Sequence, residues 1–156
     1  MVIDDFVEKL DLAHKIHPHD SRLTARKMAG ELFEEVVELS VALDEKDKLA
    51  TYQEALDVAV VAVRIALGEF SYFEKLPRNY MELGIVINFI KFVIKHEKIS
   101  ITIDDVSSQL SELALAMYKP EIPEDYYMPA LMCASFALTI AERTQAEFEE
   151  SRNEEN

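Results

Sequence analysis

The sequence is poor in residues that cross-link a chain or break its helices. Among its 156 residues it has one cysteine, three glycines, five prolines and no tryptophan. A single cysteine, Cys133, excludes a disulfide within the chain and fits a reducing compartment. Glycine and proline mark turns and interrupt helices, so their scarcity indicates long helices joined by short loops.

Positive charge is also scarce. The chain has 16 Lys and Arg residues against 30 Asp and Glu residues, which gives a formal net charge of -14. Because such a surface repels nucleic-acid backbones and anionic membranes, we expect neither a nucleic-acid polymer nor a membrane as partner. The charge as a whole is explained by solubility, but an acidic protein that handles a phosphate substrate needs metal cations to screen its own charge.

Long apolar runs are missing. The first residues, MVIDDFVEKL, have neither the basic region nor the uninterrupted apolar stretch of a signal peptide. No apolar run reaches the length that a membrane-spanning helix needs. We therefore expect a cytoplasmic protein.

Apolar residues recur at helical spacing along most of the chain and predict a single all-α domain over residues 1–150. The stretch ISIT (100–103) has the composition of a short strand, but the acids that follow it suit the first turn of a helix. We expect a disordered tail over residues 151–156. The six expected helices cover 2–16, Ser21 or Thr24 to about Leu43, about 50–68 with an extension toward Tyr72, about 80–97, Asp104 to near Lys119, and about 124–148.

The chain contains an internal echo. RLTARKMAGEL (22–32) matches SITIDDVSSQL (100–110) in pattern, and EALDVAVVAVRIA (54–66) matches PALMCASFALTIA (129–141). The echo predicts a helical bundle of two pseudo-repeated three-helix halves, residues 1–75 and 79–150. Glu54 and Asp57 correspond to Pro129 and Met132, so the first half is the candidate active half and the second is degenerate.

Acidic residues stand on the helices that are expected to form the core. Glu35 and Glu38 are three residues apart and share a helical face, as do Glu54 and Asp57. The 15 residues between the pairs, 39–53, allow a short loop and an antiparallel return that brings the pairs opposite each other.

The helix that carries Glu54 and Asp57 is apolar nearly all round. From Ala55 to Leu67 only Asp57 and Arg64 are not apolar, which is typical of a buried helix. Buried carboxylates that face one another repel and tend to protonate, unless divalent cations compensate them. A ligand set of oxygens alone suits Mg²⁺ or Mn²⁺.

A simpler interpretation stays open. Glu31, Glu34 and Glu38 would form a solvated stripe, and Glu54 and Asp57 would only favour the N-terminal part of their helix. A di-iron centre has less support, because it uses Glu-x-x-His on its helices and the histidines, at positions 14, 17, 19 and 96, lie elsewhere.

The pattern EExxE followed by ExxD on the next helix resembles the MazG-like, all-α nucleoside triphosphate pyrophosphohydrolase superfamily, which is related to the dimeric dUTPases. In this sequence it stands as Glu34-Glu35-Val36-Val37-Glu38 and Glu54-Ala55-Leu56-Asp57. The preceding KMAGEL and the apolar run after Asp57 also look like that family. The resemblance covers about residues 20–68.

The resemblance implies Mg²⁺, with Mn²⁺ as a substitute, held by Glu35, Glu38, Glu54 and Asp57. Glu34 would either support the metal ligands without binding the metal itself or act as the base for the attacking water. The implied catalytic residues are therefore Glu34, Glu35 and Glu38. The implied substrate is a nucleoside triphosphate, hydrolysed between its α and β phosphates to a monophosphate and pyrophosphate. A homodimer is the implied assembly.

Substrate contacts have weaker signals. Cations are expected near the leaving pyrophosphate, and the candidates are Lys27, Arg64, Lys91 and Lys95. For each of them a plain surface position or an ion pair is the alternative to substrate contact. The residues that could line a base pocket, or simply belong to the core, are Phe33, Tyr52, Met128 and Met132. The alternative function is a catalytically silent helical bundle that binds a protein partner.

Overall fold

The computed structural model describes residues 1–18, 24–70, 82–97, 100–118 and 124–155. Within these ranges the chain forms six α-helices and no strand, which confirms the predicted all-α bundle. Their bounds are α1 Val2–Ile16, α2 Ala25–Asp44, α3 Lys48–Ala66, α4 Leu83–Glu97, α5 Ile103–Tyr118 and α6 Glu124–Glu155.

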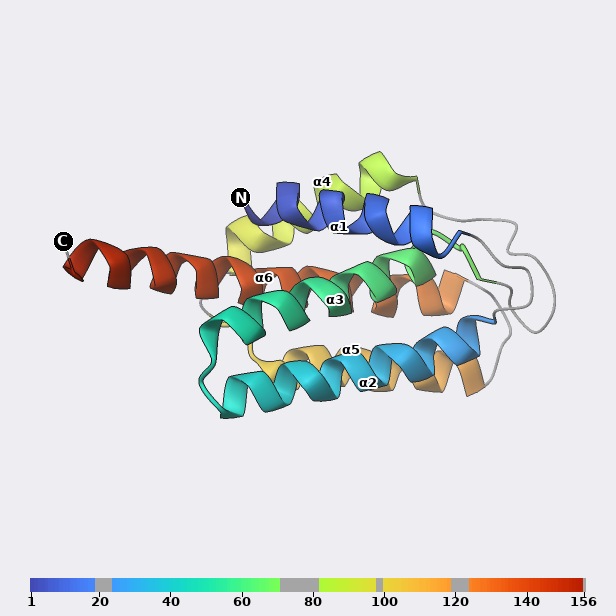
Figure 1. Cartoon of the computed structure of the whole chain (residues 1–156). Helices are drawn as coiled ribbons and strands as arrows, with labels where there is room; N and C mark the ends of the chain where they lie inside the picture. The colour runs from blue at the N-terminus through green and yellow to red at the C-terminus, as the bar shows by residue number, and fades with distance from the viewer. Residues whose placement is uncertain (19–23, 71–81, 98–99, 119–123, 156) are drawn as a thin grey trace.

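The helices form three layers of two (Figure 1). The central pair, α3 and α6, makes the most extensive contact of the bundle. On one side α2 packs on α3 and α5 packs on α6; on the other side α1 packs on α3 and α4 packs on α6. The first three helices and the last three thus repeat the same packing pattern, in agreement with the predicted pseudo-repeat.

The central helices are buried because small apolar residues cover them on nearly every side. Val58, Ala59 and Ala62 of α3 and Ala134 and Ala137 of α6 are fully buried. Small side chains let two helix backbones approach closely, which favours a tight α3–α6 contact. The expectation that residues 55–67 lie in the core is met, with only Asp57, Val61 and Leu67 partly exposed.

Local hydrogen bonds fix where the helices begin and end. The Thr24 hydroxyl accepts a hydrogen bond from the Lys27 N–H at 3.2 Å and caps α2, while the Asp47 carboxylate accepts one from the Ala50 N–H at 3.0 Å and caps α3. α3 ends at Ala66, since Gly68 takes a φ of 71°. The predicted extension of this helix toward Tyr72 is wrong over the described residues, because residues 67–70 are not helical. The alternative start at Ser21 lies outside the described residues.

The start of α5 agrees with the sequence-based expectation, and the end of α6 differs from it. The Thr102 N–H donates to the Asp105 carboxylate at 2.8 Å, so the strand-like ISIT stretch leads into α5 instead. The prediction of a disordered tail is wrong for residues 151–155, because α6 continues to Glu155. The end of α6 is exposed and extends beyond the bundle (Figure 1), and its Glu and Arg residues have high helix propensity.

Candidate metal centre

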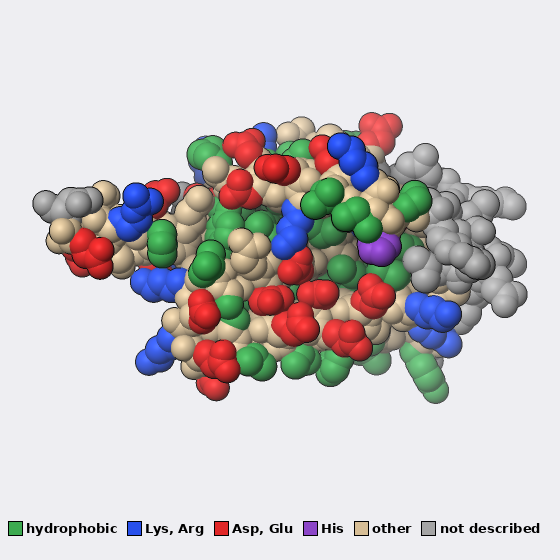
Figure 2. All heavy atoms as spheres, viewed as in Figure 1, with side chains coloured by type: hydrophobic (Ala, Val, Ile, Leu, Met, Phe, Trp, Pro, Cys, Tyr) green, Lys and Arg blue, Asp and Glu red, His purple; other side chains and the backbone are tan. Residues whose placement is uncertain are grey.

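The turn between α2 and α3 brings the predicted acids together. Lys46 takes a φ of 57°, and the chain reverses direction within the few residues between Asp44 and Lys48. α2 and α3 then pack along their length, with the face that carries Glu35 and Glu38 turned toward Glu54. On the molecular surface, acidic side chains gather over these two helices (Figure 2).

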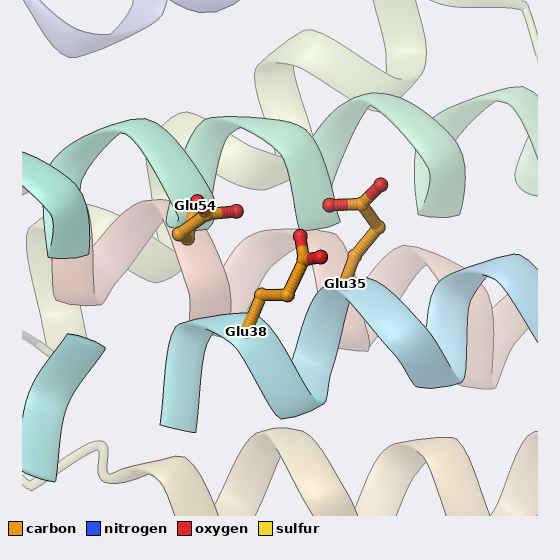
Figure 3. Close-up of side chains that lie close together, drawn as sticks. All are labelled: Glu35, Glu38 and Glu54. Carbon is orange, nitrogen blue, oxygen red and sulfur yellow. The ribbon is translucent and has the colours of Figure 1, made fainter. Parts of the chain in front are cut away.

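Glu35, Glu38 and Glu54 form a carboxylate cluster. One oxygen atom from each side chain lies within 4.8 Å of the oxygens from the other two. Figure 3 shows the three side chains pointing toward one another across the space between α2 and α3. Oxygens that share one Mg²⁺ lie up to about 4 Å apart, because Mg–O distances are about 2.1 Å. The cluster therefore fits a cation after small side-chain rotations.

The carboxylates of the cluster raise one another's pKa. The pKa of Glu35 is raised to about 7, first by burial and then by the negative charges of Asp57, Glu38, Glu54 and Glu31. The pKa of Glu54 is also raised, first by burial and then by Asp57 and by Glu38, which also hydrogen-bonds to it. A divalent cation bound among these carboxylates would lower both pKa values.

Asp57, the fourth predicted ligand, lies beside the cluster but outside the set of close oxygens. Its carboxylate Oδ1 is 2.5 Å from the Nζ of Lys9, a residue of α1. Asp57 nevertheless acts electrostatically on both Glu35 and Glu54. Three of the four predicted ligands are thus brought together, and the fourth is held nearby by a lysine.

Glu34, predicted as a base or as a group that supports the metal ligands, is exposed on α2 and is not one of the three clustered acids. It precedes Glu35 in the chain, so its backbone is close to the cluster. Its role stays a prediction.

Arg64, predicted as a substrate contact, has other partners in the structure. Its side chain is buried, with its Nε 3.1 Å from the Glu69 carboxylate and its Nη2 2.6 Å from the His17 carbonyl oxygen. The guanidinium also lies 5.4 Å from the centroid of the Phe70 ring. These contacts favour the structural alternative, in which Arg64 ties the end of α3 to the end of α1.

The predicted lysines lie on other parts of the surface. Lys27 is exposed in the first turn of α2. Lys91 and Lys95 are exposed on α4, where they line a hollow together with the N-terminal residues of α1 and Glu142 of α6. None of the three clustered glutamates lines that hollow. A role for these lysines in substrate binding stays a prediction.

The candidate base-pocket residues separate into different environments. Tyr52 lines a groove between α1 and α3, and its hydroxyl donates to the Asp5 carboxylate at 2.5 Å. Met132 lines a different hollow, between α4 and α6. Phe33 and Met128 are exposed. Of the four, only Tyr52 is on the same groove as Lys9.

Sequence reasoning missed Lys9 and Asp5. Both stand on α1, which has no motif and is far in sequence from the acids of α2 and α3. The usable signal was weak: a lysine within an amphipathic helix whose buried face is Val2, Phe6 and Leu10. Only the packing of α1 on α3 places Lys9 against Asp57.

No protein-family model, no curated protein and no solved structure matches this chain. The fold and the site by themselves define a six-helix bundle with an acidic cluster between two antiparallel helices. Within the described part of the chain, none of the helices combines the length and hydrophobicity that a membrane span requires.

Metal binding is expected to depend on the protonation of Glu35. Its pKa of about 7 means that a proton competes with the cation, so affinity for Mn²⁺ should rise as the pH increases through this range. Titration by electron paramagnetic resonance over this interval measures the effect. Glu35→Gln should weaken binding and flatten its pH dependence. An equally steep dependence in the variant would assign it to another group.

The stability of the metal-free protein should fall as the pH rises, whereas its affinity for Mn²⁺ should increase. The pKa of Glu35 is raised from 4.5 on folding, so the folded state binds this proton more tightly. The associated stability is present below pH 4.5 and is lost as the pH rises through about 7. After allowance for solvent screening of a partly exposed group, we expect a loss of about 1 kcal/mol. Thermal unfolding of the metal-free wild type and Glu35→Gln over this pH range measures it.

Proposed function

We propose that this protein is a Mg²⁺-dependent nucleotide pyrophosphohydrolase that cleaves a (d)NTP between its α and β phosphates, giving a (d)NMP and pyrophosphate. The observation that supports this most is the cluster of Glu35, Glu38 and Glu54, with the raised pKa values of two of its members. The donor set consists of carboxylates, which suits Mg²⁺, or Mn²⁺ in its place. We propose the cytoplasm as its location.

In this proposal the clustered carboxylates bind the cation and so position the triphosphate. Mg²⁺ when bound neutralises phosphate charge and lowers the pKa of a coordinated water. Glu34 is the proposed acceptor of the proton from the attacking water. The water oxygen forms a bond to the α-phosphorus, and the bond from that phosphorus to the α,β-bridging oxygen breaks.

The test is release of pyrophosphate from a panel of canonical and modified (d)NTPs, with and without Mg²⁺. The proposal expects release that needs Mg²⁺ and is strongest for a subset of bases or sugars. Absence of release over the whole panel, from protein that is folded and binds Mn²⁺, would rule out a (d)NTP of the panel as substrate. A panel of other nucleotide anhydrides would then follow.

The alternative function is a catalytically silent helical bundle that binds a protein. Measurements of stability with and without divalent cations distinguish it from the pyrophosphohydrolase. A cation that binds the folded state alone raises its stability by about 2.7 kcal/mol at a concentration 100 times its Kd. The pyrophosphohydrolase proposal expects this response to Mg²⁺ and Mn²⁺. A solvated acidic surface would respond weakly and without preference among divalent ions.

We also propose that the protein forms a homodimer through α2. The helix that supplies Glu35 and Glu38 exposes Phe33, Val37 and Val41, which are spaced four residues apart on one face. Apolar side chains are visible along the edge of the molecule where α2 lies (Figure 2). Because the stripe is apolar and carries no charge of its own, two copies can face each other across a two-fold axis despite the net charge of each chain.

Placing a charge in this stripe should prevent assembly. Val37→Glu is expected to convert a dimer to a monomer, since two carboxylates would be buried near each other at a two-fold interface. Sedimentation velocity at several protein concentrations measures the change, with Ser111→Glu on α5 as an exposed control. A wild type that sediments as a monomer at all concentrations would contradict the dimer.

A further inference from the structure

Lys9 joins the carboxylate cluster to a groove between α1 and α3. The groove has a volume of about 410 Å³. It is lined from α1 by Lys9, Leu12 and the two acids Asp5 and Glu8, and from α3 by Tyr52, Gln53 and Leu56, so Lys9 is its one cation among the described lining residues. Lys9 also contacts Asp57, whose negative charge acts on Glu35 and Glu54. One ammonium group therefore faces both the space that a ligand could enter and the acid at the edge of the metal centre.

The Lys9–Asp57 pair is accessible to solvent. The two side chains retain 30% and 35% of their exposure, so water, a cation or an anion can reach either of them. Exchange of partners at such a pair costs little, because an exposed ion pair contributes only about 0–1 kcal/mol. This differs from the buried Arg64, whose guanidinium has three sets of contacts.

The second half of the chain has apolar residues at the positions that correspond to Lys9 and Asp57. Buried residues of α1 at 2, 6 and 10 correspond to buried residues of α4 at 86, 90 and 94. This alignment places Val93 at the position of Lys9, and the α3–α6 echo places Met132 at the position of Asp57. Val93 and Met132 both line the hollow between α4 and α6. The lysine and the acid are thus replaced together.

We propose that Lys9 is the counter-ion of Asp57 only in the metal-free protein and becomes a phosphate-binding residue in the loaded one. When a divalent cation takes the Asp57 carboxylate, the Lys9 ammonium is released and pairs with phosphate oxygens of the substrate. Lys9 then favours phosphate chains that arrive with a cation and opposes the cation alone. This inference rests on the proposed function, since it assigns a second role at the same site.

The two roles predict opposite effects from one substitution. Lys9→Met removes the competitor for Asp57, so Mn²⁺ should bind about three- to tenfold more tightly in the absence of any phosphate compound. The same variant loses a charge-assisted contact, so inorganic tripolyphosphate at saturating Mn²⁺ should bind about tenfold more weakly. Electron paramagnetic resonance measures the first affinity and isothermal titration calorimetry the second.

Three comparisons complete the experiment. Lys9→Arg keeps the charge and should restore both affinities toward those of the wild type. Lys15→Met removes an exposed lysine from the same helix and should change neither. Thermal unfolding confirms that each variant is folded.

The outcomes separate this inference from the function on which it rests. Opposite shifts in the two affinities support the exchange of partners. If Lys9→Met leaves Mn²⁺ binding unchanged or weakens it, while Glu38→Gln abolishes it, then Lys9 is only a structural partner of Asp57 and the inference is overturned, with the metal centre intact. If the wild-type protein itself binds no Mn²⁺, the proposed function fails as well.

Discussion

Replacing Glu38 with Gln is expected to reduce Mg²⁺-dependent turnover by about two orders of magnitude or more. Glu38 belongs to the carboxylate cluster and is an exposed residue of α2, so its substitution removes a proposed anionic ligand without disturbing the core. The amide is nearly the same size as the carboxylate but lacks its charge. Pyrophosphate release under saturating Mg²⁺ measures the loss.

Stability distinguishes this effect from damage to the fold. Without metal, Glu38→Gln should unfold at the same temperature as the wild type or slightly higher, because a charge that repels Glu35 and Glu54 is gone. The stabilisation of the protein by Mg²⁺ should be largely lost. Glu112→Gln, on the exposed surface of α5 in the other half, is the matched control and should behave like the wild type. Full activity in Glu38→Gln would remove the metal role of this cluster.

The largest loss of stability is expected from Arg64→Ala. Arg64 is 5% exposed and bonds to Glu69 and to the His17 carbonyl, so its removal leaves buried polar groups with fewer partners. Breaking a buried ion pair from one side costs about 3–5 kcal/mol. For a chain of this size the melting temperature should fall by about 6–20 °C. Chemical and thermal unfolding measure the change.

A paired substitution tests whether the cause is the broken ion pair. Glu69 also lies 2.5 Å from the His14 imidazole, so it keeps one partner when Arg64 is absent. Arg64→Met combined with Glu69→Met removes both charges and should recover much of the lost stability. A substrate-binding Arg64 would give a different result: normal stability and a raised KM. That outcome would support the prediction that Arg64 binds the substrate.

The fold followed closely from the sequence. Few glycines and prolines, apolar residues at helical spacing and capping residues such as Thr24 are local signals, and local signals determine helices. The end of α6 was misjudged because a polar segment with few apolar residues was expected to fray, although its residues favour the helix. The ends of helices are decided by small energy differences that composition expresses poorly.

The acids of the site were also foreseeable, because Glu35, Glu38 and Glu54 lie on two consecutive helices joined by a short turn. A spacing of three residues fixes a shared helical face, and a short turn fixes an antiparallel return. The positions of the fourth predicted ligand, Asp57, and of the predicted substrate contacts depended on packing between distant segments. In the folded chain Asp57 forms an ion pair with Lys9, and Arg64 forms one with Glu69.

By itself the sequence determined the helices, the burial of α3 and α6, and the approach of three carboxylates, because each depends on residues close together in the chain. The tertiary structure alone decided which side chains from distant helices lie beside the three carboxylates. The docking of α1 on α3 placed Lys9 at Asp57 and formed the groove beside it, and the burial of Arg64 placed its guanidinium against Glu69 and the His17 carbonyl. Contacts between distant helices depend on the shape of the whole core, which no local pattern specifies.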